Sequence, residues 1–213
     1  MKKLTLATMI TSVFLTMPVL ANELHVGSGI DLKVLNTNKP SEIADNQFQL
    51  VEGKNQIVIQ VAKDYGSRGN STGYVTSHPY IITFDTKADV KLSLPRFHRA
   101  EQAEREFSKP APRWVVTTAQ GEAISYTTEP LPGRDGLAPY ANQTALVADY
   151  NKEHGLVFGN NKLEDLNALA YDVKQDGSVQ VTGDAVTQLK LWYTKATQEE
   201  KKAFKYWMLD QDM

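Results

Sequence analysis

The sequence contains no cysteine among its 213 residues. A disulfide framework and a lipid attached to an N-terminal cysteine are therefore both excluded. After the first 21 residues it also lacks any run that approaches the ~20 apolar residues needed by a membrane-spanning helix. Residues 22–213 are long enough for one domain of ordinary size, which must be stabilised by its hydrophobic core alone.

The first 21 residues have the features of a secretory signal. Lys2 and Lys3 precede an apolar run from Leu4 to Val19, and the segment ends in the small residue Ala21. A membrane anchor is the alternative, but the run is shorter than a spanning helix. We expect cleavage after Ala21 and export to the periplasm, without stable membrane insertion of the mature chain. The lack of cysteine does not distinguish the periplasm from full secretion.

Positive charge is scarce as well. Removing Lys2 and Lys3 from the 23 basic residues leaves 21 against 25 acidic residues, a net charge of about −4 with neutral histidines. A nucleic-acid partner would require a clustered positive surface, so we expect none. The composition leaves the oligomeric state open.

Alternating apolar and polar residues dominate the first 130 positions, which is typical of strands with one buried face. The clearest runs lie at residues 24–34, 57–61, 80–84 and 90–94, and turn residues separate them. Residues 114–118 and 124–126 are expected to form a hairpin around Gln120-Gly121. Residues 65–73 contain three glycines and are expected to form an exposed loop. The pattern predicts a mostly antiparallel, β-sandwich-like body.

Helical spacing is found in four segments: residues 97–107, 141–152, 163–170 and 184–208. The first is polar and is expected to lie on the surface. In the last, a capping box from Thr197 to Glu200 separates two helices, and Asp176-Gly177 forms a hairpin turn before them. The sequence therefore predicts an α+β fold with a C-terminal helical hairpin packed on the β body. We expect one domain over residues 22–213, mainly β to residue 130 and mainly helical with one hairpin beyond it.

The aromatic residues of the C-terminal hairpin admit two interpretations. They could form a platform on which a sugar or peptide stacks. Their alternation with lysines favours packing of an apolar stripe on the sheet, in which case Trp192→Ala should cost ~3–5 kcal/mol.

No catalytic, metal or cofactor site is visible in the sequence. The serine of Gly27-Ser28-Gly29 is not followed by the helix of a nucleophile elbow. Asp172 to Gly177 begins like a calcium loop, but its third position is Lys174 and its twelfth is Gly183. The four histidines share no metal-ligand spacing: His25, His78, His98 and His154. We therefore expect neither an enzyme nor a bound cofactor.

Arg96 and Arg113 are the candidate binding residues. Each directly follows a proline, and they stand at opposite ends of the polar helix. A guanidinium held by a rigid neighbour can present a fixed fork to a carboxylate or phosphate. The alternative is a structural ion pair with an acid of that helix, such as Glu101, Glu104 or Glu106.

An ordered set of short segments runs through the chain: Ile30–Leu35, Asn55–Val58, Leu94-Pro95-Arg96 with Glu104 and Phe107, Ala111-Pro112-Arg113, Tyr150-Asn151-Lys152, and Leu189–Tyr193 with Phe204 and Trp207. This set resembles the YccT-like family of uncharacterised exported bacterial proteins, some of which are named inhibitors of curli secretion. The resemblance implies export to the periplasm, no assigned activity, no catalytic residue or cofactor, and a role in restraining amyloid-type fibre subunits. It assigns no binding residue.

Two functions are consistent with these observations. The first is a non-enzymatic binding or chaperone-like protein, one edge strand of which pairs with an extended, β-type client subunit. The alternative is a cell-envelope binder of a glycan or anionic small molecule, acting through Arg96 and Arg113. A hydrolase would require Asp, His and Ser side chains in one cleft.

Overall fold

The computed structural model describes residues 22–66, 73–159, 162–165, 171–173, 179–181 and 185–211. The predicted signal, most of the predicted 65–73 loop and the Asp176-Gly177 turn lie outside the described residues.

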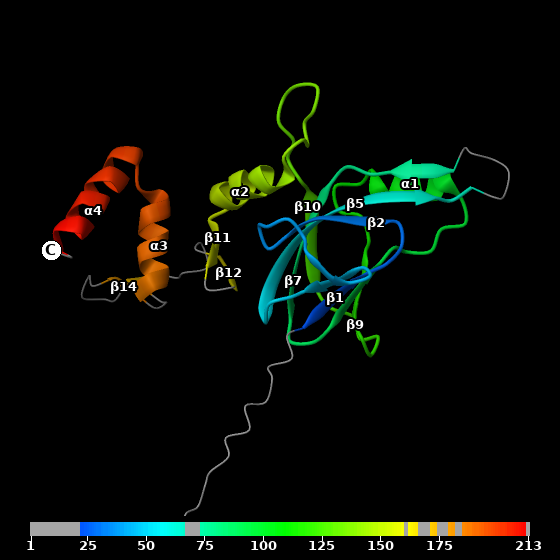
Figure 1. The fold of residues 1–213 in the computed structure, drawn as a ribbon, viewed down its shortest axis with the longest axis horizontal. Coiled ribbons are helices and arrows are strands. Elements are labelled where there is room, and N and C mark those ends of the chain that lie inside the picture. The colour runs from blue at the N-terminus through cyan, green and yellow to red at the C-terminus, as the bar shows by residue number, and fades with distance from the viewer. Residues whose placement is uncertain are drawn as a thin grey trace, which may run out of the picture.

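Two sheets form the body (Figure 1). The first has the strand order β3-β4-β1-β8-β9, with bounds Glu42–Ala44, Gln47–Gln49, Glu23–Val26, Val90–Ser93 and Val115–Thr118. The second has the order β10-β7-β5-β2, with bounds Tyr126–Pro130, Tyr80–Thr86, Gly53–Asp64 and Ile30–Leu35, and β6 (Tyr74–Thr76) pairs with the end of β5. Neighbouring strands are antiparallel except β1 and β8, which run parallel.

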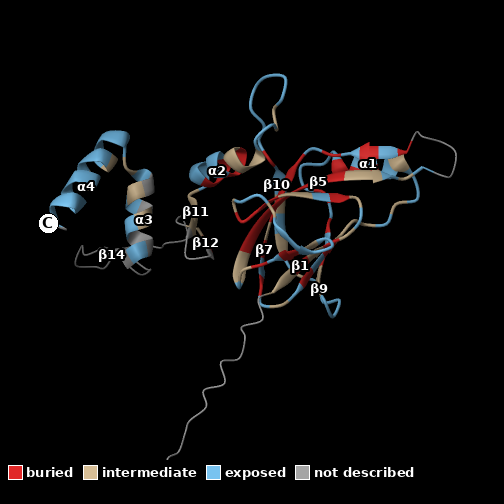
Figure 2. Cartoon of the chain, in the orientation of Figure 1, coloured by how far each residue is buried: buried red, intermediate tan, exposed pale blue. Residues whose placement is uncertain are grey.

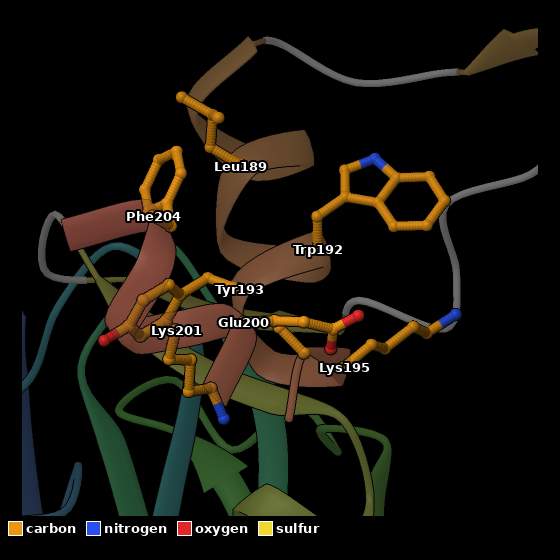
Figure 3. Close-up of a pocket in the computed structure, with 8 residues that line it drawn as sticks. Leu189, Trp192, Tyr193, Lys195, Glu200, Lys201 and Phe204 are labelled. Carbon is orange, nitrogen blue, oxygen red and sulfur yellow. The ribbon is translucent and has the colours of Figure 1, made fainter. Parts of the chain in front are cut away.

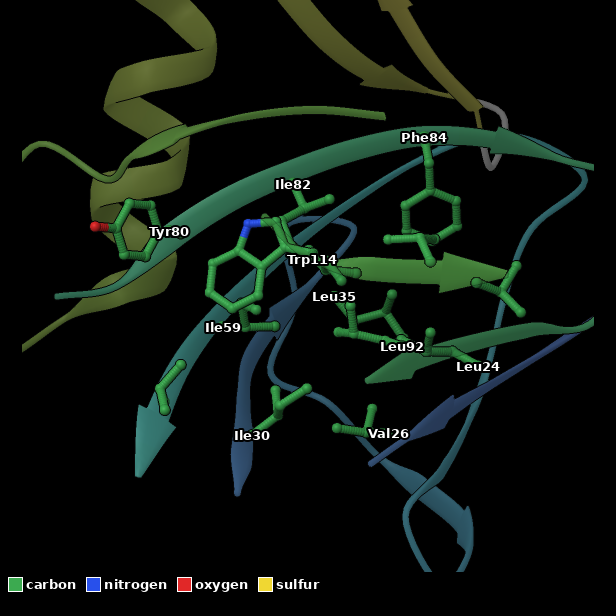
Figure 4. Close-up of a cluster of buried hydrophobic side chains, with 14 of the residues drawn as sticks. Leu24, Val26, Ile30, Leu35, Ile59, Tyr80, Ile82, Phe84, Leu92 and Trp114 are labelled. Atoms are coloured by element: carbon green, nitrogen blue, oxygen red, sulfur yellow. The ribbon is translucent and has the colours of Figure 1, made fainter. Parts of the chain in front are cut away.

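The main core lies between the two sheets (Figure 4). Ile57, Ile59 and Val61 of β5 point into it, because alternate side chains of a strand face the same side. Val58 points to the opposite side of the second sheet, where it belongs to a separate buried cluster. The second sheet is therefore buried on both faces, which accounts for the nearly continuous apolar run in β5.

Two helices complete the body. α1 (Ala100–Phe107) buries Ala103 and Phe107 at the margin of the main core. α2 (Gln143–Glu153) covers the outer face of the second sheet, where its residues Leu146, Val147 and Tyr150 pack with Val34, Val58, Ile81 and Leu131. Asn142 caps α2, since its side chain accepts a hydrogen bond from the Ala145 N–H at 3.2 Å.

The remaining elements follow α2. β11 (Leu156–Gly159) pairs with β12 (Lys162–Asp165), and β13 (Tyr171–Val173) pairs with β14 (Val179–Val181). α3 (Ala185–Lys195) and α4 (Gln198–Gln211) form the C-terminal hairpin. The α+β class is thus confirmed, with a mostly antiparallel two-sheet body followed by a helical hairpin.

The hairpin departs from expectation in how it packs. α4 has no buried residue, and Trp192 and Trp207 are each 55 % exposed. Figure 2 shows α3 and α4 beside the β body with mostly exposed surfaces. The prediction that Trp192 packs in the core is therefore wrong. The outer apolar face of the second sheet is covered by α2 instead of the hairpin.

Two local predictions also need correction. Residues 163–165, expected to begin a helix, lie in β12 (Lys162–Asp165), and Leu163 is buried there. The predicted 114–126 hairpin is reduced to a single bridge between Thr117 and Ala123. Its two arms pair mainly with other strands, β9 with β8 and β10 with β7, because the chain crosses from one sheet to the other at this point.

Candidate functional site: a cationic groove around α1

Arg96 and Arg113, 17 positions apart in the sequence, line one surface groove of about 410 Å³. Arg105 and Lys109, from α1 and the turn after it, contribute two more cationic side chains. Phe97, His98, Gln102 and Glu106 complete the lining. The chain thus brings together the two arginines that the sequence placed at opposite ends of the helix.

Glu106 organises one side of the groove. Its carboxylate is only 6 % exposed, and it accepts hydrogen bonds from Lys109 Nζ at 2.7 Å and from Arg113 Nε at 3.2 Å. The backbone N–H of Arg113 donates a third, at 2.9 Å. Burial alone would raise the pKa of Glu106, but these three donors outweigh it and lower the pKa to about 2. The carboxylate is therefore ionised at neutral pH and fixes the position of Arg113.

Arg96 has a different environment. It is exposed, and among the described residues it has no hydrogen-bond or ion-pair partner. Arg105 donates from Nε to the backbone carbonyl of Glu101, four positions earlier, at 3.2 Å. Four cationic side chains therefore surround a groove in which Glu106 is the one lining carboxylate. This excess of cationic side chains favours an anion in the groove.

The body holds the scaffold of the groove firmly. The Tyr80 hydroxyl lies 2.6 Å from the Phe107 carbonyl oxygen and 2.8 Å from that of Lys109, so its one proton can be donated to an acceptor at the end of α1 or just after it. Trp114 stacks on Phe107 with ring centroids 5.3 Å apart. Both contacts reach the main core. The residues on either side of Lys109 and Arg113 are thus anchored, which limits the entropy lost when a ligand is bound.

Sequence reasoning missed Arg105 and Lys109 as partners of the two arginines. The usable signal was the number of basic residues between the two arginines, since Arg105 lies on α1 and Lys109 in the turn that leads from α1 to Arg113. The sequence gives no indication that Glu106 is buried, because its burial depends on how α1 packs against the rest of the protein.

A neighbouring groove of about 380 Å³ contains Ser77, His78 and Glu104, the residue types of a hydrolytic site. Ser77 is already occupied structurally: its hydroxyl donates to the His78 carbonyl at 2.7 Å and accepts from the Val61 N–H at 2.9 Å. It therefore stabilises the break between β6 and β7. This arrangement does not prepare the hydroxyl to act as a nucleophile.

Within the described part of the chain, no three His, Asp or Glu side chains cluster in a way that could hold a metal ion. No described helix combines the length and apolar character required to cross a bilayer.

The fold and the groove define a class of protein, an α+β body of two packed sheets that carries a cationic groove around one surface helix. The chain belongs to the family described as "Uncharacterized protein conserved in bacteria (DUF2057)", the model of which matches residues 23–207. No solved structure matches it.

Among the relatives are UPF0319 proteins of several bacteria. One from Vibrio vulnificus (strain YJ016) is 37 % identical over 158 residues, which is 74 % of this chain and 75 % of the relative. One from Vibrio parahaemolyticus is 30 % identical and covers 88 % of this chain and 85 % of the relative. The UPF0319 protein YccT of Salmonella agona is 28 % identical over 91 % of both chains. The predicted resemblance to YccT-like proteins is therefore confirmed.

Proposed function

We propose that this chain is an exported, non-enzymatic binding protein of the periplasm that holds an anionic ligand in the groove around α1. The observation that carries the proposal is the concentration of Arg96, Arg105, Lys109 and Arg113 around one hollow with a single lining carboxylate. Planar guanidinium groups suit carboxylate and phosphate oxygens, which they can bind in a bidentate manner. The ligand class is therefore a carboxylated glycan fragment or an anionic small molecule.

The two arginines of the sequence prediction take different parts in this function. The Arg113 side chain is 73 % exposed although its Nε is paired with Glu106. The ion pair holds the guanidinium group in place while part of it faces solvent. Arg96 supplies a charge that no described side chain neutralises. Substituting Arg96 should therefore weaken binding with little effect on folding, whereas substituting Arg113 also removes a partner of the buried Glu106.

The test is calorimetric titration of residues 22–213 with citrate, inorganic phosphate and peptidoglycan fragments. We expect heat with at least one of these anions, weakening as salt is raised. The double variant Arg96→Gln/Arg105→Gln should lose this heat. Arg99→Gln is the matched control, because Arg99 is an exposed arginine next to α1 that does not line the groove. No heat with any anion, or equal heat from the double variant, would remove the proposal.

A second candidate function is the restraint of fibre subunits, which the YccT-like resemblance implies. β2 is an edge strand of the second sheet, so its outer side can accept an extended client segment. Its pairing with β5 is interrupted by a register shift between Leu32 and Val34, which shortens the straight part of that edge. β3, an edge of the other sheet, is only three residues long.

The irregular pairing of β2 and the shortness of β3 make the groove a better supported binding surface than either of these two edges. Fibril growth of a curli-type subunit in the presence of stoichiometric protein distinguishes the two mechanisms. Inhibition that survives Arg96→Gln/Arg105→Gln would favour an edge strand, and inhibition lost in that variant would favour an acidic client segment bound in the groove. Unchanged fibril growth with the native protein would eliminate this second function.

A further inference from the structure

The exposed apolar side chains of this protein are concentrated in one place. Of the eleven large apolar residues exposed in the described parts of the chain, seven lie on α3 and α4. These are Val186, Leu189, Trp192, Tyr206, Trp207, Met208 and Leu209. An apolar concentration of this kind on an otherwise polar surface typically marks a site of interaction.

The two helices enclose a shallow apolar groove of about 400 Å³, lined by Leu189, Trp192, Tyr193 and Phe204 among others (Figure 3). The rings of Tyr193 and Phe204 lie 6.2 Å apart, and Phe204 stacks on Trp207 at 5.6 Å. The contact between Tyr193 and Phe204 joins α3 to α4, whereas Phe204 and Trp207 are neighbours on α4. Trp192, Tyr206 and Trp207 are each more than half exposed.

Lysines accompany the aromatic residues. Lys195 and Lys201 line the groove, and Lys201 lies 5.5 Å from the centre of the Tyr193 ring. The lining carboxylate of Glu200 is engaged in the cap of α4, where it accepts from the Thr197 N–H at 2.7 Å and from the Thr197 hydroxyl at 2.9 Å. The groove therefore combines an apolar floor with a cationic rim.

The charge of the hairpin is opposite to that of the whole mature chain. Residues 185–211 contain five lysines and three acidic residues, a net charge of +2, whereas residues 22–213 carry about −4 once Lys2 and Lys3 are removed from the total. A negatively charged surface would attract the hairpin and repel the remainder of the protein. Such a surface would orient the molecule with α3 and α4 toward it.

We propose that the α3–α4 hairpin docks in the plane of an anionic lipid surface. Trp and Tyr rings prefer the boundary between headgroups and acyl chains, while lysines reach the headgroup phosphates. The lengths of the helices agree with this orientation, since the 11 residues of α3 and the 14 of α4 correspond to roughly 16 and 21 Å, short of the ~30 Å hydrocarbon core. The hairpin lies on the bilayer and does not cross it.

Tryptophan fluorescence gives a direct test. Trp114 is buried in the body, so a change in emission on addition of vesicles reports on Trp192 and Trp207. With residues 22–213 and vesicles of phosphatidylglycerol and phosphatidylcholine, we expect co-sedimentation and a blue shift, both reduced by high salt. Vesicles of phosphatidylcholine alone should bind much less protein.

Replacing lysines tests the role of charge without removing any apolar side chain from the hairpin. Lys202→Gln/Lys205→Gln should lower the partition coefficient by roughly 30-fold, because each lysine near an anionic surface contributes about 1 kcal/mol. Lys87→Gln/Lys91→Gln, which removes two exposed lysines of the body, is the matched control and should bind as the native protein does.

Two results would overturn the proposal. The first is equal binding to both kinds of vesicle at all salt concentrations, which would remove the role of charge. The second is no binding to either kind of vesicle. If light scattering then shows a dimer that becomes a monomer in Trp207→Ser, the aromatic face belongs to the contact with a second copy of the chain.

Discussion

Gln56 and Asn151 exchange two hydrogen bonds through their side-chain amides across 95 positions of the sequence. Gln56 Nε2 donates to Asn151 Oδ1 at 2.7 Å, and Asn151 Nδ2 donates to Gln56 Oε1 at 2.9 Å. Both residues are buried, one on the outer side of β5 and the other on α2. Among the described residues, each of the two side-chain amides forms its hydrogen bonds with the other, so the pair specifies how α2 lies on the sheet.

Removing one amide should therefore destabilise the protein. Asn151→Ala leaves the buried Gln56 amide without its partner, and we expect a loss of ~1–3 kcal/mol in the free energy of unfolding. The measurement is urea unfolding, with exposed Gln120→Ala as the control. In a double-mutant cycle with Gln56→Ala the two losses should not add. Strict additivity would show that the amides act independently.

Glu106 should make the stability depend on acid. Its pKa is lowered from 4.5 to about 2 in the folded state, so its contribution is complete above pH 4.5 and is lost as the pH falls toward 2. The shift corresponds to about 3 kcal/mol at neutral pH. Glu106→Gln should lose stability of this order at pH 7 and show a flatter profile below pH 4.5. Glu104→Gln removes an exposed carboxylate of the same helix and should change little; an equal loss there would contradict the assignment.

Trp114 and Trp207 should differ in their contribution to stability. Trp114 is 5 % exposed, stacks on Phe107 and donates from Nε1 to Thr128 Oγ1 at 3.0 Å. Trp114→Ala should cost ~3–5 kcal/mol. Trp207→Ala should change the free energy of unfolding of the body by no more than ~0.5 kcal/mol. Far-ultraviolet circular dichroism is the suitable probe, and equal losses for the two variants would argue for a buried hairpin.

Tyr150 should make the stability sensitive to alkali. Burial is the main cause that raises the pKa of Tyr150 well above its usual value, and the hydrogen bond to the Glu129 carboxylate adds to the effect. Because the pKa of Tyr150 is higher in the folded state than in the unfolded state, its contribution to stability is complete below pH 10 and is lost as the pH rises further. Tyr150→Phe should cost ~1.5–3 kcal/mol at pH 7 and reduce the alkaline loss measured by urea unfolding between pH 8 and 11. An unchanged alkaline profile would show that Tyr150 is not the responsible group.

Local features of this fold were predictable from sequence. The capping box is present as expected, because Glu200 N donates to Thr197 Oγ1 at 3.3 Å while the Glu200 carboxylate accepts from the Thr197 N–H. α2 ends at the expected place, with His154 as its C-cap and Gly155 at φ 66°. These signals depend only on residues within one or two turns of each other.

What could not be predicted depends on long-range contacts. Leu163 sits in a leucine-rich stretch with helical spacing, yet its pairing opposite Phe158 places it in a strand. Trp192 is exposed, and α2 covers the apolar sheet face that the hairpin was expected to cover. Likewise, the sequence could nominate Arg96 and Arg113, but only the packing of α1 places Arg105 and Lys109 in the same groove.

The parallel pairing of β1 with β8 has a consequence for the order of folding. Leu24 is aligned with Val90, and the Glu23 N–H donates to Asp89 across 66 positions. A chain emerging from its N-terminus therefore presents β1 long before its partner β8 exists, and the first sheet cannot be completed until β9 has followed. Contacts of such separation slow folding, and in the interval one side of β1 is open to strands of other chains. Rapid capture of β1 by its nearer antiparallel neighbour, β4, would limit that exposure.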